Sequence, residues 1–161
     1  MWLSKEEQAQ ASDLLDLHAR HVRQMRSIVD AIMAARKRKR PDSLLVGELI
    51  KQLEAVESSD QEAFLSLVRL YGCHRTASLL EEEYKELREC YEVMRADESR
   101  QKVALYEKRL DQFQLATEIA TTLLRELLGL SSKTKEKRTA ETIATAEDVL
   151  KRENDYDQKE E

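Results

Sequence analysis

Apolar side chains recur every three or four residues along most of this chain, which is the spacing of an amphipathic α-helix. The first such stripe follows Ser4-Lys5-Glu6-Glu7, a segment with the form of a helix capping box. The stripe consists of Ala11, Leu15, His18, Val22, Met25, Val29 and Ile32. Its alternation of four and three residues predicts a helix over about 4–40 that packs against a partner helix.

The middle of the chain predicts two shorter helices. Asp42 or Ser43 can cap the first of them, and a second capping box at Ser59 predicts the start of the other. Apolar residues are dense over 64–71, so we expect this segment to be the most deeply buried. Gly72 follows it, where a left-handed C-terminal cap is expected.

Residues 76–128 contain neither proline nor glycine, and strong helix formers dominate them. We therefore expect one very long helix over about 76–129 that ends at Gly129. Its apolar stripe fades through the polar stretch 95–102 and resumes at Val103 out of the original heptad phase. The helix either continues with a phase shift or bends there, and continuity is the favoured interpretation.

These elements together predict an all-α fold class, an elongated helical hairpin or bundle with coiled-coil character over residues 1–130. Residues 131–161 are expected to form a linker, a short amphipathic helix and an acidic disordered tail. The 161-residue chain has three glycines and one proline, too few turn residues for a sheet protein of this length.

Charge and cysteine content exclude several classes of protein. The formal net charge of −5 argues against coating nucleic acid over the whole surface. Cys73 and Cys90 are too sparse for a disulfide framework, so we expect free thiols and an intracellular location, cytoplasmic or nuclear. The sequence has neither a membrane-spanning apolar stretch nor the pattern of a signal peptide.

The sequence offers no arrangement that predicts catalysis or a bound cofactor. The residue types that bind zinc are present, but the sequence has no Cys-x2-Cys motif or other closely spaced second pair of ligands. The residues concerned are His18, His21, Cys73, His74 and Cys90. Cys73 lies beside His74, yet adjacent residues usually point apart, so a nucleophile and its base are not expected there. We expect a non-enzyme without metal, cofactor or small-molecule substrate.

A basic run is the local exception to the acidic balance. It consists of Arg36, Lys37, Arg38, Lys39 and Arg40. Followed by Pro41, it is similar to a short nuclear import signal, and it equally fits a phosphate-contacting patch or an anionic-lipid contact. A purely structural explanation is also open, because cations at a helix C-terminus oppose the negative end of the helix dipole.

The segment 64–80 resembles locally the helix-turn-helix of DNA-binding proteins. It has an apolar helix, a turn glycine and a second helix that opens in polar residues. The resemblance implies that His74, Arg75 and Thr76 begin a recognition helix in the major groove. That helix then continues into the acidic run Glu81–Glu83, which repels phosphates.

The function that these patterns favour is helix-mediated assembly, as a scaffold or adaptor subunit of a larger intracellular complex. A first helix of about 36 residues is too short to cover a long helix of about 55, so apolar surface should remain for a protein partner in a homo- or hetero-oligomer. The expected interface residues are Leu15, Val22, Met25, Val29, Tyr106, Leu110, Phe113, Leu124 and Leu127. The alternatives are a DNA-binding oligomeric regulator using 64–80 with 36–40, and a helical chaperone of the secretion or flagellar type.

Overall fold

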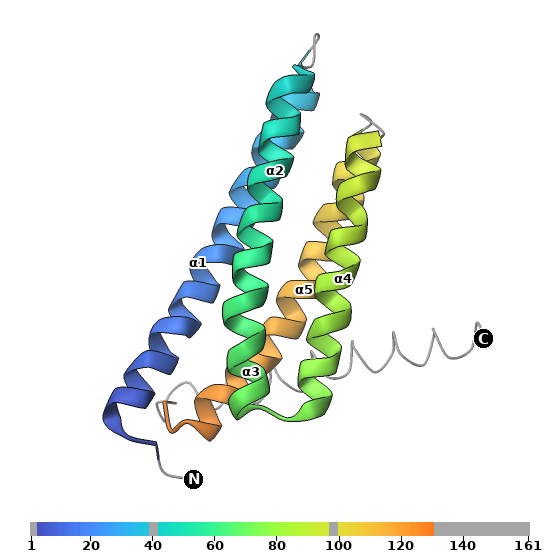
Figure 1. The fold of residues 1–161 in the computed structure, drawn as a ribbon. Helices are drawn as coiled ribbons and strands as arrows, with labels where there is room; N and C mark the ends of the chain where they lie inside the picture. The colour runs from blue at the N-terminus through green and yellow to red at the C-terminus, as the bar shows by residue number, and fades with distance from the viewer. Residues whose placement is uncertain (1–2, 39–41, 97–99, 131–161) are drawn as a thin grey trace, which may run out of the picture.

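The computed structural model describes residues 3–38, 42–96 and 100–130, and all the regular secondary structure in these ranges is helical. The elements are α1 (Lys5–Arg36), α2 (Ser43–Asp60), η1 (Gln61–Leu65), α3 (Ser66–Tyr71), α4 (His74–Ala96) and α5 (Arg100–Leu127). Because α2, η1 and α3 follow without a break, the bundle has four helices, which run alternately up and down (Figure 1). The predicted all-α fold class is confirmed. The predicted linker, amphipathic helix and tail lie outside the described residues.

Local capping explains where the first two helices begin. The amide of Glu7 donates to the Ser4 hydroxyl at 3.1 Å, and that hydroxyl donates to Glu7 Oε1 at 3.0 Å, so the predicted helix start is confirmed. Of the two candidate caps for α2, Asp42 takes the role. Its Oδ1 accepts hydrogen bonds from the amides of Leu44 and Leu45 at 3.1 and 3.2 Å.

The glycines at two later helix ends behave differently from each other. Gly129 has a φ of 70°, in the left-handed region. The amide of Leu130 donates to the carbonyl of Arg125 at 2.8 Å and that of Gly129 to Glu126 at 3.2 Å, which closes α5 in a Schellman motif. Gly72 is extended, with φ −91° and ψ −177°, so the left-handed cap predicted after α3 is wrong.

The middle helix is continuous where two helices were predicted. Ser59, the predicted cap of a separate helix, lies inside α2, and the chain passes directly into the π-helical turn η1. The hydroxyl of Ser66 donates to the carbonyl of Glu62 at 2.6 Å across this turn. Asp60 and Phe64, which follow the expected break at Ser59, are buried in the core. Packing of these side chains holds the segment in a helix and overrides the local capping preference.

The single very long helix predicted over 76–129 is wrong. Two helices occupy this range, α4 ending at Ala96 and α5 beginning at Arg100, and they pack side by side in opposite directions (Figure 1). The reversal falls within the polar stretch where the apolar stripe fades. Folding back buries the apolar faces of both halves within the same chain, which stabilises the bundle more than a few further helical residues would.

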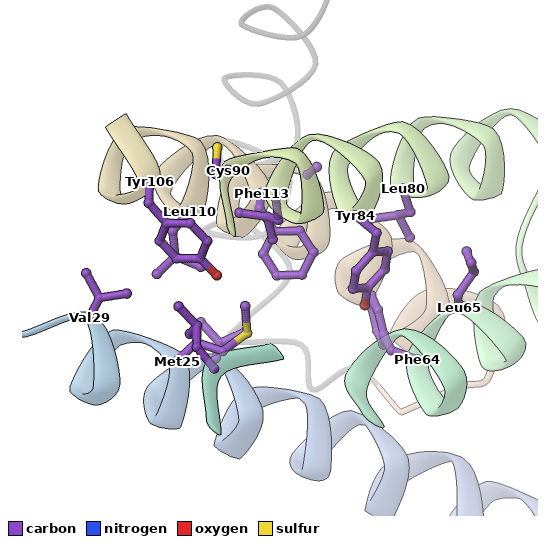
Figure 2. Packing of buried hydrophobic residues seen from close by; sticks show 14 of the residues in the cluster. Met25, Val29, Phe64, Leu65, Leu80, Tyr84, Cys90, Tyr106, Leu110 and Phe113 are labelled. Atoms are coloured by element: carbon purple, nitrogen blue, oxygen red, sulfur yellow. The ribbon is translucent and has the colours of Figure 1, made fainter. Parts of the chain in front are cut away.

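The core is a cluster to which every helix contributes. Every residue of the predicted stripe in α1 is buried. Figure 2 shows Tyr84, Tyr106 and Phe113 on one side of the interior and Met25 and Phe64 on the facing side. Packing is most extensive within the two hairpins, α1 with α2 and α4 with α5. We call the contact zone between the continuous helix α2–η1–α3 and helix α4 the α2–α4 seam. This seam is one of the places where the two hairpins meet.

Candidate functional site

The apolar residues expected to bind a partner lie almost entirely inside the bundle. Those buried in the core of this single chain are Leu15, Val22, Met25, Val29, Tyr106, Leu110, Phe113 and Leu124. Leu127 alone of the predicted set is exposed, near the end of α5. The sequence placed these side chains on an intermolecular surface because the reversal between α4 and α5 was not expected, and that reversal covers them. These eight side chains are therefore not available on the surface of this chain.

The basic run is divided between the core and the surface. Arg36 is buried, and its guanidinium donates to the carbonyl of Met94 near the C-terminus of α4. Carbonyls at a helix C-terminus attract cations, so this contact fastens α1 to α4. Lys37 and Arg38 are exposed, while Lys39 and Arg40 lie outside the described residues. A role in nuclear import, phosphate contact or lipid contact stays a prediction.

The segment that resembles a helix-turn-helix forms a turn between antiparallel neighbours. His74 and Arg75 are exposed at the start of α4, and Thr76 is partly buried. In Figure 1, α3 and α4 run side by side in opposite directions. The helices of a helix-turn-helix cross at roughly 90–120° instead.

Asp60 is the centre of a polar cluster, and its burial was not predicted from the sequence. Its side chain is fully buried, and its carboxylate accepts hydrogen bonds from two other helices. Nδ1 of His18 lies 2.9 and 3.0 Å from the two carboxylate oxygens, Nδ1 of His21 lies 3.0 Å from Oδ1, and the Tyr84 hydroxyl donates to Oδ2 at 2.7 Å. Because a carboxylate only accepts, both histidine Nδ1 atoms carry the hydrogen. These donors offset the cost of removing the charge from water.

Aromatic rings enclose this cluster. The imidazole of His18 stacks on Phe64 with ring centroids 3.8 Å apart, and its edge meets Phe113 at 6.2 Å. The ring of Tyr84 packs against Phe113 at 4.9 Å in an edge-to-face arrangement (Figure 2). Burial raises the pKa of the Tyr84 hydroxyl, and the negative charge of Asp60 raises it further. The phenol therefore keeps its proton and stays a hydrogen-bond donor.

Glu57 lies less than one turn before Asp60 and is equally buried, but its surroundings differ. Neither carboxyl oxygen has a hydrogen-bond donor among the described residues. Nε of Arg88 on α4 lies 3.7 Å from Glu57 Oε1, and the Arg88 side chain is 51% exposed. Burial raises the pKa of Glu57 to about 7, against a lowering by the positive charge of Arg88 and with a further rise from Asp60. Glu57 therefore exchanges its proton near neutral pH, inside the core.

The π-turn η1 begins directly after Asp60 and ends at Leu65. Such turns are rare and occur frequently at functional sites. Here Asp60 immediately precedes the turn and Phe64 lies within it, and both of these side chains contact His18. The turn therefore positions an acid and an aromatic ring on the same imidazole.

Two concave features lie along the α2–α4 seam. The first, which we call the end pocket, has a volume of about 90 Å³ and is lined chiefly by Arg36, Val46, Gly47, Ile50, Met94 and Arg95. The second, the polar groove, is lined by Gln61 and by charged side chains of α3 and α4, including Arg69 and Arg88. Arg88 thus connects the polar groove to the buried Glu57. Ion pairs of Arg95 with Glu54 and of Arg69 with Glu81 also cross the seam.

Comparisons with family models, with curated proteins and with solved structures found no match. Within the described residues, no group of three or more histidine, cysteine, aspartate or glutamate side chains has the arrangement to hold a metal ion. No helix in the same ranges is long and apolar enough to cross a membrane.

The residue types considered for zinc binding do not come together. His18 and His21 meet at Asp60, whereas Cys73 is exposed at the turn before α4 and Cys90 is buried within α4. A hydrogen bond with the Thr76 hydroxyl, at 2.9 Å, lowers the pKa of the Cys73 thiol. Burial raises the pKa of the Cys90 thiol. The two cysteines are therefore separate thiols in different environments.

The spacing of α2 contains the signal for the buried acids. Val46, Ile50 and Leu53 are buried at steps of four and three residues, and Glu57 and Asp60 continue the same steps. An inventory of apolar residues passes over these two positions, because charged side chains are seldom buried. The unbroken alternation is the observation that places them on the core face.

Proposed function

We propose that this protein is a non-enzymatic helical subunit or adaptor that binds a protein partner at the end pocket of the α2–α4 seam. The observation that carries the proposal is an apolar pocket whose wall includes a glycine from the interior of a helix, Gly47. The apolar stripes of the helices are buried within the chain, so we assign the assembly surface to the end pocket instead.

The end pocket has room for one short aliphatic side chain. Its volume of about 90 Å³ is smaller than the roughly 150 Å³ apolar cavity that holds benzene. Val46, Ile50 and Met94 supply apolar walls. In protein interfaces, an anchor side chain seated in such a pocket provides much of the binding free energy.

Gly47 leaves one wall of the pocket open. A Cβ atom at this position would meet no atom within 4 Å, so packing within the chain does not require glycine. Glycine inside a helix costs about 0.5–1 kcal/mol relative to alanine. A partner that lies close against α2 explains why this position is glycine, because a side chain here would keep the partner away. Leu44, on the same helix face three residues earlier, is 82% exposed and extends the apolar surface.

Cations gather at the same end of the bundle. Arg36 and Arg95 line the end pocket, and Lys37 and Arg38 are exposed where α1 ends. Arg95 also forms an ion pair with Glu54, which neutralises part of this positive charge. Complementary charge steers partners and fixes their orientation. The partner segment is therefore expected to carry an acidic residue beside its aliphatic anchor.

Affinity purification from the native host, with quantitative mass spectrometry, tests the proposal. Gly47→Leu alters the pocket and Leu44→Glu the exposed apolar surface beside it. Leu70→Glu is a matched control at the other end of the α2–η1–α3 helix, where Leu70 is 71% exposed. We expect one protein to be retained by the wild type and by L70E and lost by L44E and G47L, with circular dichroism unchanged.

Equal retention of the same proteins by all four forms would overturn the proposal, as would a wild type that elutes as a monomer without a partner. A salt-sensitive complex with duplex DNA and no protein partner would support the DNA-binding alternative instead.

A further inference from the structure

Two acidic side chains of α2 are buried within one turn of each other and have opposite surroundings. Asp60 accepts hydrogen bonds from side chains of α1 and α4, whereas Glu57 has no hydrogen-bond donor among the described residues. A buried carboxylate without donors is costly, because nothing replaces the hydrogen bonds that water provides. A neutral carboxylic acid in the same place costs much less. The interior therefore prefers Glu57 with its proton.

The titratable groups that interact with Glu57 lie on α2, α4 and α5, and those of α1 are linked to it only through Asp60. They are Asp60 on α2, Tyr84, Arg88 and Tyr91 on α4, Tyr106 on α5 and, through Asp60, His18 and His21 on α1. The hydroxyls of Tyr91 and Tyr106 lie 3.3 Å apart and hydrogen-bond to each other. Burial raises the pKa of both phenols, so they remain neutral, and Arg88 is the cation in this set that approaches Glu57.

Arg88 compensates the charge of Glu57 only in part. Its Nε is 3.7 Å from Oε1, longer than a hydrogen bond, and half of its side chain is in contact with water. Water screens the attraction between a half-exposed guanidinium and a buried acid. Burial therefore outweighs the ion pair and sets the pKa of Glu57 to about 7.

We propose that Glu57 is a proton-binding site that regulates the α2–α4 seam, taking up a proton as the seam closes and releasing it as the seam loosens. The protonated side chain is neutral and fits the apolar interior. The ionised side chain needs water or closer contact with a guanidinium, and both are available from the polar groove, which Arg88 lines. Loosening is expected at this seam because the cation that approaches Glu57 belongs to α4.

Hydrogen exchange on the isolated protein, between pH 5 and 8 and corrected for intrinsic exchange rates, tests the proposal. Glu57→Gln removes the titrating group, and Glu54→Gln is a matched control one turn earlier on α2, where Glu54 pairs with Arg95. In the wild type and in E54Q, the opening equilibrium of α2 and α4 should increase about tenfold more between pH 6 and 8 than in E57Q. The comparison with E57Q also cancels any contribution from His18 and His21.

Carboxyl-carbon NMR of glutamate-labelled protein gives a second measurement. One signal should titrate near pH 7 and be missing from E57Q. A Glu57 signal that titrates with the other glutamates would overturn the proposal, and so would an E57Q variant with the pH dependence of the wild type. If E57Q does not fold, Arg88→Met serves in its place, because removing the cation must move the Glu57 midpoint to higher pH. An unchanged midpoint in R88M would equally overturn the proposal.

Discussion

The hydroxyl of Tyr84 donates a 2.7 Å hydrogen bond to Oδ2 of Asp60, and this contact joins α4 to α2 in the middle of the core. The same carboxylate is held by His18 and His21 of α1, so three helices meet at one buried acid. Both partners of the Tyr84 contact are removed from water. Leaving one of them unpaired would cost its full desolvation free energy.

Tyr84→Phe should therefore lower the free energy of unfolding by about 1–3 kcal/mol, because it leaves Asp60 short of a donor but keeps the ring and its packing on Phe113. Urea unfolding measures this change. Tyr71→Phe is the control, since Tyr71 is only partly buried at the end of α3, and its effect should stay within about 0.5 kcal/mol. Equal losses in the two variants would contradict a special role for the Asp60 contact.

The free energy of unfolding should fall as the pH rises from about 4.5 to 7. Burial raises the pKa of Glu57 from 4.5 to about 7 in the folded protein, so in this window the folded state binds more protons than the unfolded chain. One pKa unit corresponds to about 1.4 kcal/mol, so the full effect is about 3 kcal/mol and is complete above pH 7. Urea unfolding of the wild type and Glu57→Gln at several pH values measures it. A difference between the two that is constant with pH would contradict the prediction.

Gly47→Ala should stabilise the protein by about 0.5–1 kcal/mol, because α2 is helical at this position and the added Cβ meets nothing within 4 Å. Gly129→Ala should do the opposite, since Gly129 has a φ of 70°. Thermal unfolding of the pair measures both signs. A G47A protein less stable than the wild type would show that the helix around the end pocket is not held as described.

Gly72→Ala should destabilise the protein although its backbone conformation is open to any residue. An added Cβ would lie 2.6 Å from the carbonyl oxygen of Val68, a backbone atom that cannot move without disturbing α3. The amide of Gly72 donates to that same oxygen at 2.7 Å, so relieving the clash lengthens this hydrogen bond. We expect a loss of about 1–3 kcal/mol in thermal or urea unfolding. A G72A protein as stable as the wild type would mean that the turn adjusts freely.

Helix ends that depend on capping by neighbouring residues were predictable from the sequence. The reversal of direction between α4 and α5 was not. Ser4 and Gly129 act through atoms within a few residues of themselves, so the capping patterns identified them. The separation of α4 from α5 follows instead from burying two apolar faces against each other and the first hairpin. Strong helix formers on both sides of Ala96 carry no information about that long-range gain.

The candidate site was hidden for a related reason. Glu57 and Asp60 have the charge of surface residues, and only their spacing after Leu53 distinguishes them from the exposed acids of α4. Their different chemistry depends on neighbours from other helices, namely Tyr84 for Asp60 and Arg88 for Glu57. Those neighbours are fixed by the tertiary fold, so sequence spacing could indicate a buried acid but not its protonation.

The geometry of the π-turn determines which side chains after it face the core. Such a turn holds one residue more than an α-helical turn, and each helical residue advances the face by about 100°. If all five residues of 61–65 took α geometry instead, everything after them would rotate about the helix axis, taking Leu67 and Val68 away from the interior where they are buried. The number of residues between Asp60 and Phe64, as much as the identity of either, keeps an acid and an aromatic ring on one histidine.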